Sequence, residues 1–220
     1  METYDVLVLG GGPAGITLAK NIGKQKKIGL VRPEDHSMIY CAMPYAIEDL
    51  LPLEKTLKRD ALVTDAGADL IRDKAVKVNF ADKKVYTKKN GSLQYEKLVI
   101  ATGADPLLPP LKGTDLKGVF RFKSEDDMRT ILHAVNNGLE QAVVVGAGAI
   151  GVELAQALVK KGVATKLVDM TTQILPNLMD YEMVEEAEEK LIKAGVELYL
   201  NTKVTALKGT QFVEEVELEK

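Results

Sequence analysis

Two glycine-rich segments share one pattern and constrain the fold more than any other feature of the chain. They are DVLVLGGGPAGITLAKNI near the start and QAVVVGAGAIGVELAQAL near the middle. Each has a short apolar run, then glycines spaced Gly-x-Gly-x-x-Gly, then an amphipathic helical stretch. One offset, 136 residues, relates all three pairs of glycines: Gly10 and Gly146, Gly12 and Gly148, Gly15 and Gly151.

The residues around these glycines predict a strand, a tight turn and a helix in each copy. The runs 6–9 and 143–145 are apolar without alternation, as in strands buried on both faces of a parallel sheet. Helices are expected over about 13–24 and 149–161. In such a turn the first glycine permits the bend, the second lets a pyrophosphate approach, and the third lets helix and strand pack closely. Two such matches predict dinucleotide binding at both sites, whereas one alone would be weak.

An acidic residue completes the pattern in the second copy. The predicted strand 164–168 ends at Asp169, 23 residues after Gly146, where a carboxylate binds the adenosine ribose of NAD. The following residues, Met170-Thr171-Thr172, offer no arginine for a 2′-phosphate, so the sequence favours NADH over NADPH.

The first copy lacks an acid at the matching place. Its predicted strand 27–31 ends in Val31-Arg32, where a carboxylate is expected. Glu34 or Asp35, slightly further along, is a candidate for the same ribose, and Glu34 is preferred. Either side chain is also explained as ordinary surface charge.

The remaining segments predict an α/β fold. It has two Rossmann-like, three-layer ββα domains with parallel sheets, each with a small antiparallel meander. Strands are expected at 74–80, 83–86, 93–95 and 98–101, with a hairpin turn at Asn90-Gly91. The Pro- and Gly-rich segment 105–118 is interpreted as a linker, which places the domains at 1–112 and 113–220. Further helices are expected from Ser124 to Asn136 and from Asp180 to Ala194, followed by strands at 196–200, 203–207 and 212–218.

Composition excludes several classes of protein. A net charge of −3 and a pI near 5.6 give no basic field for nucleic acid. The longest apolar run, 142–159, is broken by glycines and polar residues, so no membrane span is expected. The N-terminus lacks the basic stretch of a signal peptide, and a single cysteine suits a reducing compartment, so a cytoplasmic location is expected. No metal site is expected.

The single cysteine, Cys41, precedes Ala42-Met43-Pro44-Tyr45, where a helix with proline in its first turn is expected to begin. A thiol at that point faces the positive end of the helix dipole, which favours the thiolate. An isolated cysteine is more often a small buried hydrophobe. The two nucleotide motifs favour a redox role here, because a flavin could lie alongside the first strand-helix-strand unit.

With these motifs together, the sequence resembles the pyridine nucleotide-disulfide oxidoreductases. Within that family it resembles the single-cysteine coenzyme A-disulfide reductases, NADH oxidases and NADH peroxidases. The matching segments are residues 10–15, Ser37 with Cys41 and Pro44-Tyr45, residues 95–103, and residues 146–153. The resemblance implies FAD on the first motif, NADH on the second, and hydride passing through flavin to Cys41. It implies these cofactor-binding residues: Gly10, Gly12, Pro13, Ala14, Gly15, Glu34, Ser37, Ala101, Thr102, Gly103, Gly146, Gly148, Ile150, Gly151, Glu153 and Asp169.

Departures from the family pattern narrow the activity. Relatives with two redox cysteines carry the second five residues on, where this chain has Ala46. Peroxidases and water-forming oxidases carry a histidine in the first glycine loop, where this chain has Pro13. The preferred activity is therefore reduction of a small disulfide, persulfide or polysulfide, such as coenzyme A disulfide. Two alternatives stay open: an NADH oxidase that reduces oxygen, and a non-catalytic nucleotide-binding fragment.

The resemblance also implies a longer protein. Family members are about twice as long and end in a dimer-interface domain, so this chain is interpreted as a fragment of a protein whose full-length form is a homodimer.

Overall fold

The computed structural model describes residues 2–220 and divides the chain into two compact units. Unit 1 comprises Met1–Ile39 and Leu57–Asp105, and unit 2 comprises Tyr40–Thr56 and Pro106–Lys220. The segment with Cys41 thus belongs to the same compact unit as the second glycine motif. The functional division into 1–112 and 113–220 stays a prediction.

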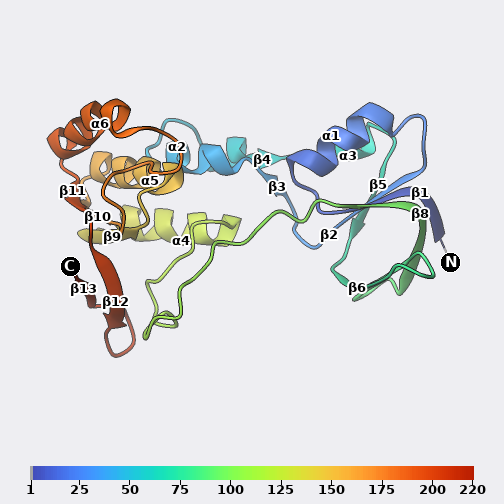
Figure 1. The fold of residues 1–220 in the computed structure, drawn as a ribbon. Helices are drawn as coiled ribbons and strands as arrows, with labels where there is room; N and C mark the ends of the chain where they lie inside the picture. Colours follow the sequence, from blue (N-terminus) through green and yellow to red (C-terminus); the bar gives the residue numbers. More distant parts are fainter. Residues whose placement is uncertain (1) are drawn as a thin grey trace. The chain divides into compact units, whose positions relative to one another are not determined.

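Unit 1 is built on one six-stranded sheet in the order β5-β2-β1-β8-β7-β6 (Figure 1). Strands β5, β2, β1 and β8 run parallel, and β8, β7 and β6 form an antiparallel meander. The strands are β1 (Glu2–Leu9), β2 (Ile28–Arg32), β5 (Asp69–Arg72), β6 (Ala75–Asn79), β7 (Lys84–Thr87) and β8 (Ser92–Ile100). A short separate pair joins β3 (Ser37–Met38) to β4 (Leu57–Lys58).

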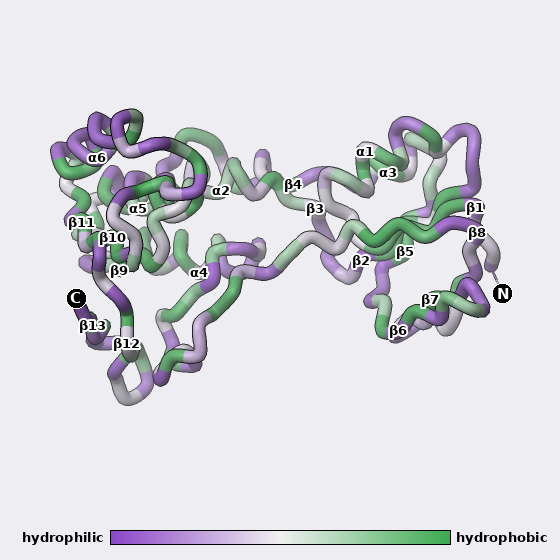
Figure 2. Tube along the Cα trace, in the orientation of Figure 1, coloured by the Kyte–Doolittle hydropathy of each residue, from purple (hydrophilic) through white to green (hydrophobic). Residues whose placement is uncertain are grey.

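Helices cover one face of this sheet. Alternate residues of β1 point to opposite faces, so Leu7 packs in one apolar cluster and Val8 in the other. The cluster with Val8 includes Ile16 of α1 (Pro13–Ile22) and Val63 of α3 (Ala61–Thr64). The cluster with Leu7 is completed by side chains of β7 and β8 instead. Figure 2 shows how strongly the hydrophobic residues of unit 1 concentrate in its central strands.

The hairpin of unit 1 confirms the predicted turn but corrects one strand boundary. Gly91 has a φ of +74°, and the Thr87 N–H donates to the Gly91 carbonyl at 2.8 Å. Strand β8 is continuous over Ser92–Ile100, not two strands at 93–95 and 98–101. It is continuous because its first residues pair with β7 while the whole strand pairs with β1. The polar residues Glu96 and Lys97 lie in the middle of β8, between the two predicted strands.

Unit 2 contains a three-stranded parallel sheet in the order β11-β10-β9. Its strands are β9 (Gln141–Val145), β10 (Ala164–Val168) and β11 (Glu197–Tyr199). Its longer helices are α4 (Glu125–Asn136), α5 (Ala149–Lys160) and α6 (Tyr181–Ala194) (Figure 1). A hairpin of β12 (Lys203–Lys208) and β13 (Glu215–Glu219) stands in place of a full meander. Within the described chain β9 pairs only with β10, and its Val143 and Val145 are exposed.

Helix boundaries in unit 2 follow the predicted caps. Ser124 accepts a hydrogen bond from the Asp127 N–H, and the Asp127 carboxylate accepts one from the Ser124 N–H in return. Helix α6 begins after Asp180 as predicted, although the Asp180 side chain makes no capping hydrogen bond. The segment with Cys41 contributes short helices, a 3₁₀ turn (Tyr40–Ala42), α2 (Met43–Ile47) and a 3₁₀ turn (Leu53–Thr56). Within residues 2–220, no helix is both long enough and apolar enough to span a membrane.

Candidate functional site

In unit 1 the first glycine motif forms a turn between β1 and α1 that only small residues permit. Gly10 has a φ of +114°, and a Cβ there would lie 2.1 Å from the Ala101 carbonyl oxygen. A Cβ on Gly15 would lie 2.3 Å from the Gly10 oxygen. By contrast, a Cβ on Gly12, at the N-cap of α1, would meet no atom within 4 Å. The second glycine therefore faces open space, as an approaching pyrophosphate requires.

Unit 2 repeats this geometry at the turn between β9 and α5. Gly146 has a φ of +107°, and a Cβ on Gly151 would lie 1.8 Å from the Gly146 oxygen. A Cβ on Gly148, the N-cap of α5, would again meet nothing within 4 Å. Both helix N-termini thus offer unpaired N–H groups and a partial positive charge beside open space. The tight turn, the open second glycine and the close helix–strand approach expected from the spacing are present in both units.

Asp169 follows β10 and is held in place by the glycine turn itself. The Ala147 N–H donates to one carboxylate oxygen at 2.6 Å. The Thr171 N–H and hydroxyl donate to the other at 2.8 and 2.7 Å. Partial burial alone would raise the pKa of Asp169, but these donors hold it below its ordinary value. Asp169 is therefore a fixed, ionised acceptor beside the turn.

The matching end of β2 in unit 1 carries a different group. Arg32 is only 2% exposed, and its stem packs against Gly11, where a Cβ would lie 2.3 Å from the Arg32 Cδ. Its guanidinium pairs with Asp60, which also pairs with Arg72 of β5. Glu34, the preferred ribose acid, is exposed, and its backbone carbonyl accepts a hydrogen bond from Arg72.

Two buried side-chain atoms in the described chain, residues 2–220, have no hydrogen-bond partner: Arg32 Nε and Ser37 Oγ. A buried polar group without a partner costs about 1–3 kcal/mol, so such atoms point to a missing partner such as a ligand. Both follow the first glycine motif in unit 1, and Ser37 is one of the residues expected to bind FAD. These atoms fit a cofactor in unit 1.

The other predicted cofactor residues lie after β8 in unit 1 and on α5 in unit 2. Ala101 follows β8, and its N–H donates to the Leu9 carbonyl at 2.8 Å, which sets Thr102 and Gly103 beside the first turn. Both of these residues are exposed. On α5, Ile150 is 61% exposed and Glu153 is partly buried.

Cys41 lies in the 3₁₀ turn before α2, and its side chain is exposed. Cys41 is therefore not a core residue. Helix α2 begins at Met43 with Pro44 in its first turn, as predicted, but has only five residues, so its dipole contributes less than that of a long helix.

The segment with Cys41 is fastened to the rest of unit 2 by named contacts. The Lys123 ammonium lies 3.7 Å from the centre of the Tyr40 ring. Glu48 and Asp49, after α2, form ion pairs with Lys160 and Lys161 at the end of α5. Helix α2 also packs against α5 and α4.

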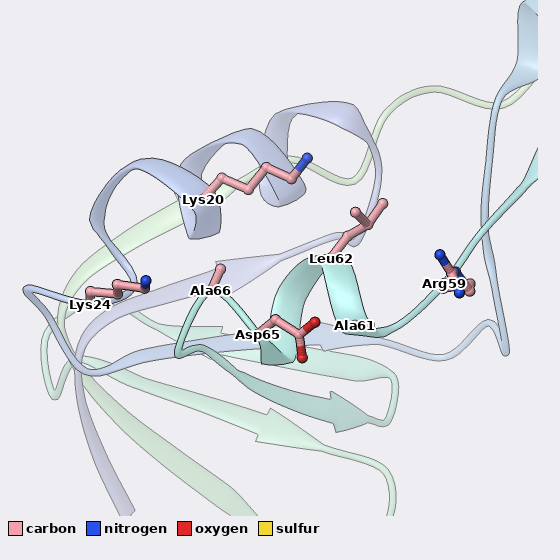
Figure 3. Close-up of a pocket in the computed structure, with 7 residues that line it drawn as sticks. All are labelled: Lys20, Lys24, Arg59, Ala61, Leu62, Asp65 and Ala66. Carbon is pink, nitrogen blue, oxygen red and sulfur yellow. The ribbon is translucent and has the colours of Figure 1, made fainter.

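A groove of about 380 Å³ lies between α1 and α3 in unit 1. Figure 3 shows the side chains that line it. Lys20 of α1, Lys24 just after α1 and Asp65 at the C-cap of α3 border it. Its lining residues are Lys20, Lys24, Arg59, Ala61, Leu62, Asp65 and Ala66. None of the predicted site residues lines this groove, so it is separate from the glycine turn.

Sequence reasoning missed the groups that orient the acids. Thr171 donates two hydrogen bonds to Asp169. The Asp-x-Thr sequence could have predicted the first of them, because an Asp side chain commonly accepts from the backbone N–H two residues on. The pairing of Arg32 with Asp60 gave no local signal, because the two residues are 28 positions apart.

Comparison with known proteins agrees with these features. The sequence profile of the pyridine nucleotide-disulphide oxidoreductase family matches residues 4–220. The chain is similar to an NADH oxidase of Methanocaldococcus jannaschii, with 32% identity over 96% of this chain and 50% of that protein. It is also similar to a CoA-dependent NAD(P)H sulfur oxidoreductase of Pyrococcus furiosus, with 30% identity over 98% of this chain and 51% of that protein.

Among solved structures, it is similar to an NAD-dependent persulfide reductase from A. fulgidus. The TM-score is 0.91 and the identity 28%, over 97% of this chain and 42% of that one. The chain thus spans about half the length of the curated relatives it matches.

Proposed function

Because the chain belongs to the pyridine nucleotide-disulphide oxidoreductase family, whose members use FAD and NADH, we propose that it carries reducing equivalents from NADH, by way of FAD, to Cys41. Cys41 then reduces a small disulfide, persulfide or polysulfide, such as coenzyme A disulfide. The observation that carries this proposal is the pair of matched glycine turns, each with an open second glycine beside a helix N-terminus.

Unit 2 supplies the nucleotide end of the reaction. The N-terminus of α5 binds the pyrophosphate of NADH, and Asp169 accepts a hydrogen bond from the ribose 2′-hydroxyl. An ionised carboxylate repels a 2′-phosphate, and Met170 offers no compensating charge, so NADH is preferred over NADPH. Glu153 and Ile150 on α5 are proposed to lie near the nicotinamide half.

Unit 1 holds the flavin nucleotide in the same way. The N-terminus of α1, with Pro13 and Ala14 in its first turn, binds the pyrophosphate of FAD. Ser37, whose buried hydroxyl lacks a partner among residues 2–220, and the backbone at 101–103 complete the site. When bound, FAD supplies the two-electron carrier between nicotinamide and sulfur.

Cys41 performs the sulfur chemistry. Its thiolate attacks one sulfur of the substrate disulfide, a new S–S bond joins Cys41 to that half, and the other half leaves as a thiolate. Two electrons from NADH then break this mixed disulfide, which restores the Cys41 thiolate and releases the second half of the substrate as a thiolate. With protons counted, NADH, one proton and one disulfide yield NAD⁺ and two thiols. The exposure of Cys41 supports this role, since a buried thiol would be inert.

The test is the visible spectrum of the purified protein, recorded anaerobically before and after NADH is added. The proposal expects a yellow protein whose flavin absorbance NADH bleaches and coenzyme A disulfide restores. A protein that takes up no FAD, yet binds NADH in a titration, would instead support the non-catalytic nucleotide-binding alternative.

A second candidate function is NADH oxidation by oxygen. It is favoured by the similarity to the M. jannaschii protein named NADH oxidase. Oxygen uptake that depends on NADH and needs no disulfide would identify it. For either activity we propose that the full-length protein is a cytoplasmic homodimer acting on a small sulfur compound or oxygen. The free, exposed cysteine supports the cytoplasmic location, because it suits a reducing compartment.

A further inference from the structure

The ends of β2 and β10 are equivalent positions in the two units. The Gly10 N–H donates to the Val31 carbonyl at 2.8 Å, and the Gly146 N–H donates to the Val168 carbonyl at 2.8 Å. The next residue in each chain segment therefore occupies the ribose-binding position of the fold. Unit 2 has Asp169 there, whereas unit 1 has Arg32, a reversal of charge.

Arg32 is not a free surface cation. It is 2% exposed beneath Gly11, and burial together with the nearby Arg72 lowers the pKa of its guanidinium. A buried charge is tolerated only when it is paired and hydrogen-bonded. Its Nη2 pairs with Asp60 and also donates to the Asp35 carbonyl at 3.3 Å. The charge of Arg32 is thus paired with the carboxylate of Asp60.

Asp60 is held at this strand end by two arginines. It sits at the N-cap of α3, where Arg32 pairs with one carboxylate oxygen and Arg72 pairs with the other. The Asp60 side chain is still 42% exposed, and each carboxylate oxygen can accept a further hydrogen bond. The Asp60 carboxylate therefore lies beside Arg32, which occupies the position where this fold usually has an acidic residue.

Within residues 2–220, the buried Nε of Arg32 has no hydrogen-bond partner. A ribose hydroxyl both donates and accepts, so it satisfies a carboxylate and an N–H at the same time. Asp60 pairs with both Arg32 and Arg72, and Asp35 lies 3.9 Å from Arg72, so two carboxylates balance two guanidinium groups and leave no net positive charge for a phosphate. Arg32 is therefore not placed to bind a 2′-phosphate, the role that an arginine at this strand end has in NADP-binding domains.

We propose that Asp60 and Arg32 together bind the adenosine ribose of the FAD in unit 1. Asp60 accepts a hydrogen bond from one ribose hydroxyl, and Arg32 Nε donates to a ribose oxygen, with Arg72 as a positioning residue. This inference rests on the proposed binding of FAD in unit 1. Asp60 thus takes the place of Glu34, the residue that the sequence favoured as the acceptor for the ribose hydroxyl. The Glu34 side chain is exposed, and no ion pair described within residues 2–220 holds it.

The experiment measures binding of FAD and of an FAD analogue whose adenosine carries 2′,3′-dideoxyribose. Titrations follow flavin fluorescence, with excess NAD⁺ present to occupy unit 2. The proteins are the unaltered chain, Asp60→Asn, Arg32→Lys, Glu34→Gln and, as a matched acid at the C-cap of α3, Asp65→Asn. Circular dichroism melting of each variant reports folding separately.

The unaltered chain and Asp65→Asn should bind FAD about 10- to 100-fold more tightly than the analogue, as expected for hydrogen bonds to a charged group. Asp60→Asn should bind both flavins with nearly equal, weaker affinity, and Arg32→Lys should lose part of the discrimination. The inference is overturned if Asp60→Asn keeps the full preference for FAD, or if Glu34→Gln alone abolishes it. If the unaltered chain binds neither flavin, the proposed function fails and this inference fails with it.

Discussion

The backbone N–H of Ala147 donates a 2.6 Å hydrogen bond to the carboxylate of Asp169, so this contact joins the glycine turn of unit 2 to the end of β10. The turn that we propose as the pyrophosphate site therefore also orients the carboxylate that we propose as the ribose acceptor. Such an arrangement is organised before the nucleotide arrives, which lowers the entropic cost of binding.

Replacing Asp169 should weaken NADH binding. Asp169→Asn removes the charge that accepts from the ribose, and we expect affinity for NADH to fall about 10- to 100-fold. Adding Met170→Arg should improve NADPH binding, because a guanidinium can then pair with the 2′-phosphate. The measurement is a titration that follows nicotinamide fluorescence, with Asp126→Asn on α4 as a control. Unchanged NADH affinity in Asp169→Asn would remove Asp169 from the site.

The second and third glycines of unit 2 should respond differently to alanine. In Gly151→Ala the new Cβ collides with the Gly146 oxygen, so the unfolding free energy should fall by about 1–3 kcal/mol and Tm should drop. In Gly148→Ala the Cβ enters open space, so Tm should be nearly unchanged while NADH affinity falls. Thermal melting and NADH titration of both variants check this. Equal Tm losses in the two variants would contradict it.

Asp73 should stabilise the β7–β8 hairpin in a pH-dependent way. Its carboxylate accepts hydrogen bonds from the N–H groups of Lys89 and Asn90 and from the Asn90 side chain. Burial alone would raise the pKa of Asp73, but these donors hold it well below its ordinary value. The stabilisation is therefore present above the unfolded-state pKa, near 3.9, and is lost as pH falls through the lower folded-state pKa.

We accordingly expect Asp73→Asn to lower Tm at pH 7, and the difference from the unaltered chain to shrink steadily below about pH 4. Melting curves over that range are the measurement, with Asp82→Asn, in the turn between β6 and β7, as a comparison. A difference in Tm that stays constant down to acidic pH would show that the carboxylate charge of Asp73 is not involved.

Local sequence signals predicted the parts of the fold that depend on neighbours in the chain. The glycine turns, the Ser124 cap and the Asn90-Gly91 hairpin each require particular residues at fixed spacing, and each is present. Strand β5 and helix α3 were missed because both have only four residues, too few to show a period.

Long-range relationships had no such signal. The Arg32–Asp60–Arg72 cluster joins three distant segments, so only the folded chain brings it together. The placement of the Cys41 segment in unit 2 depends likewise on the packing of α2 against α5 and on the Glu48–Lys160 ion pair. The sequence places that segment within the predicted functional domain 1–112, and this functional division stays a prediction.

The role of Cys41 is the centre of the proposed function, and one comparison tests it most directly. Flavin bleaching by NADH and turnover of coenzyme A disulfide are measured anaerobically for the unaltered protein and for Cys41→Ser. The account predicts that NADH bleaches the flavin of both proteins, whereas only the unaltered protein releases coenzyme A thiol. Normal disulfide turnover by Cys41→Ser would contradict it.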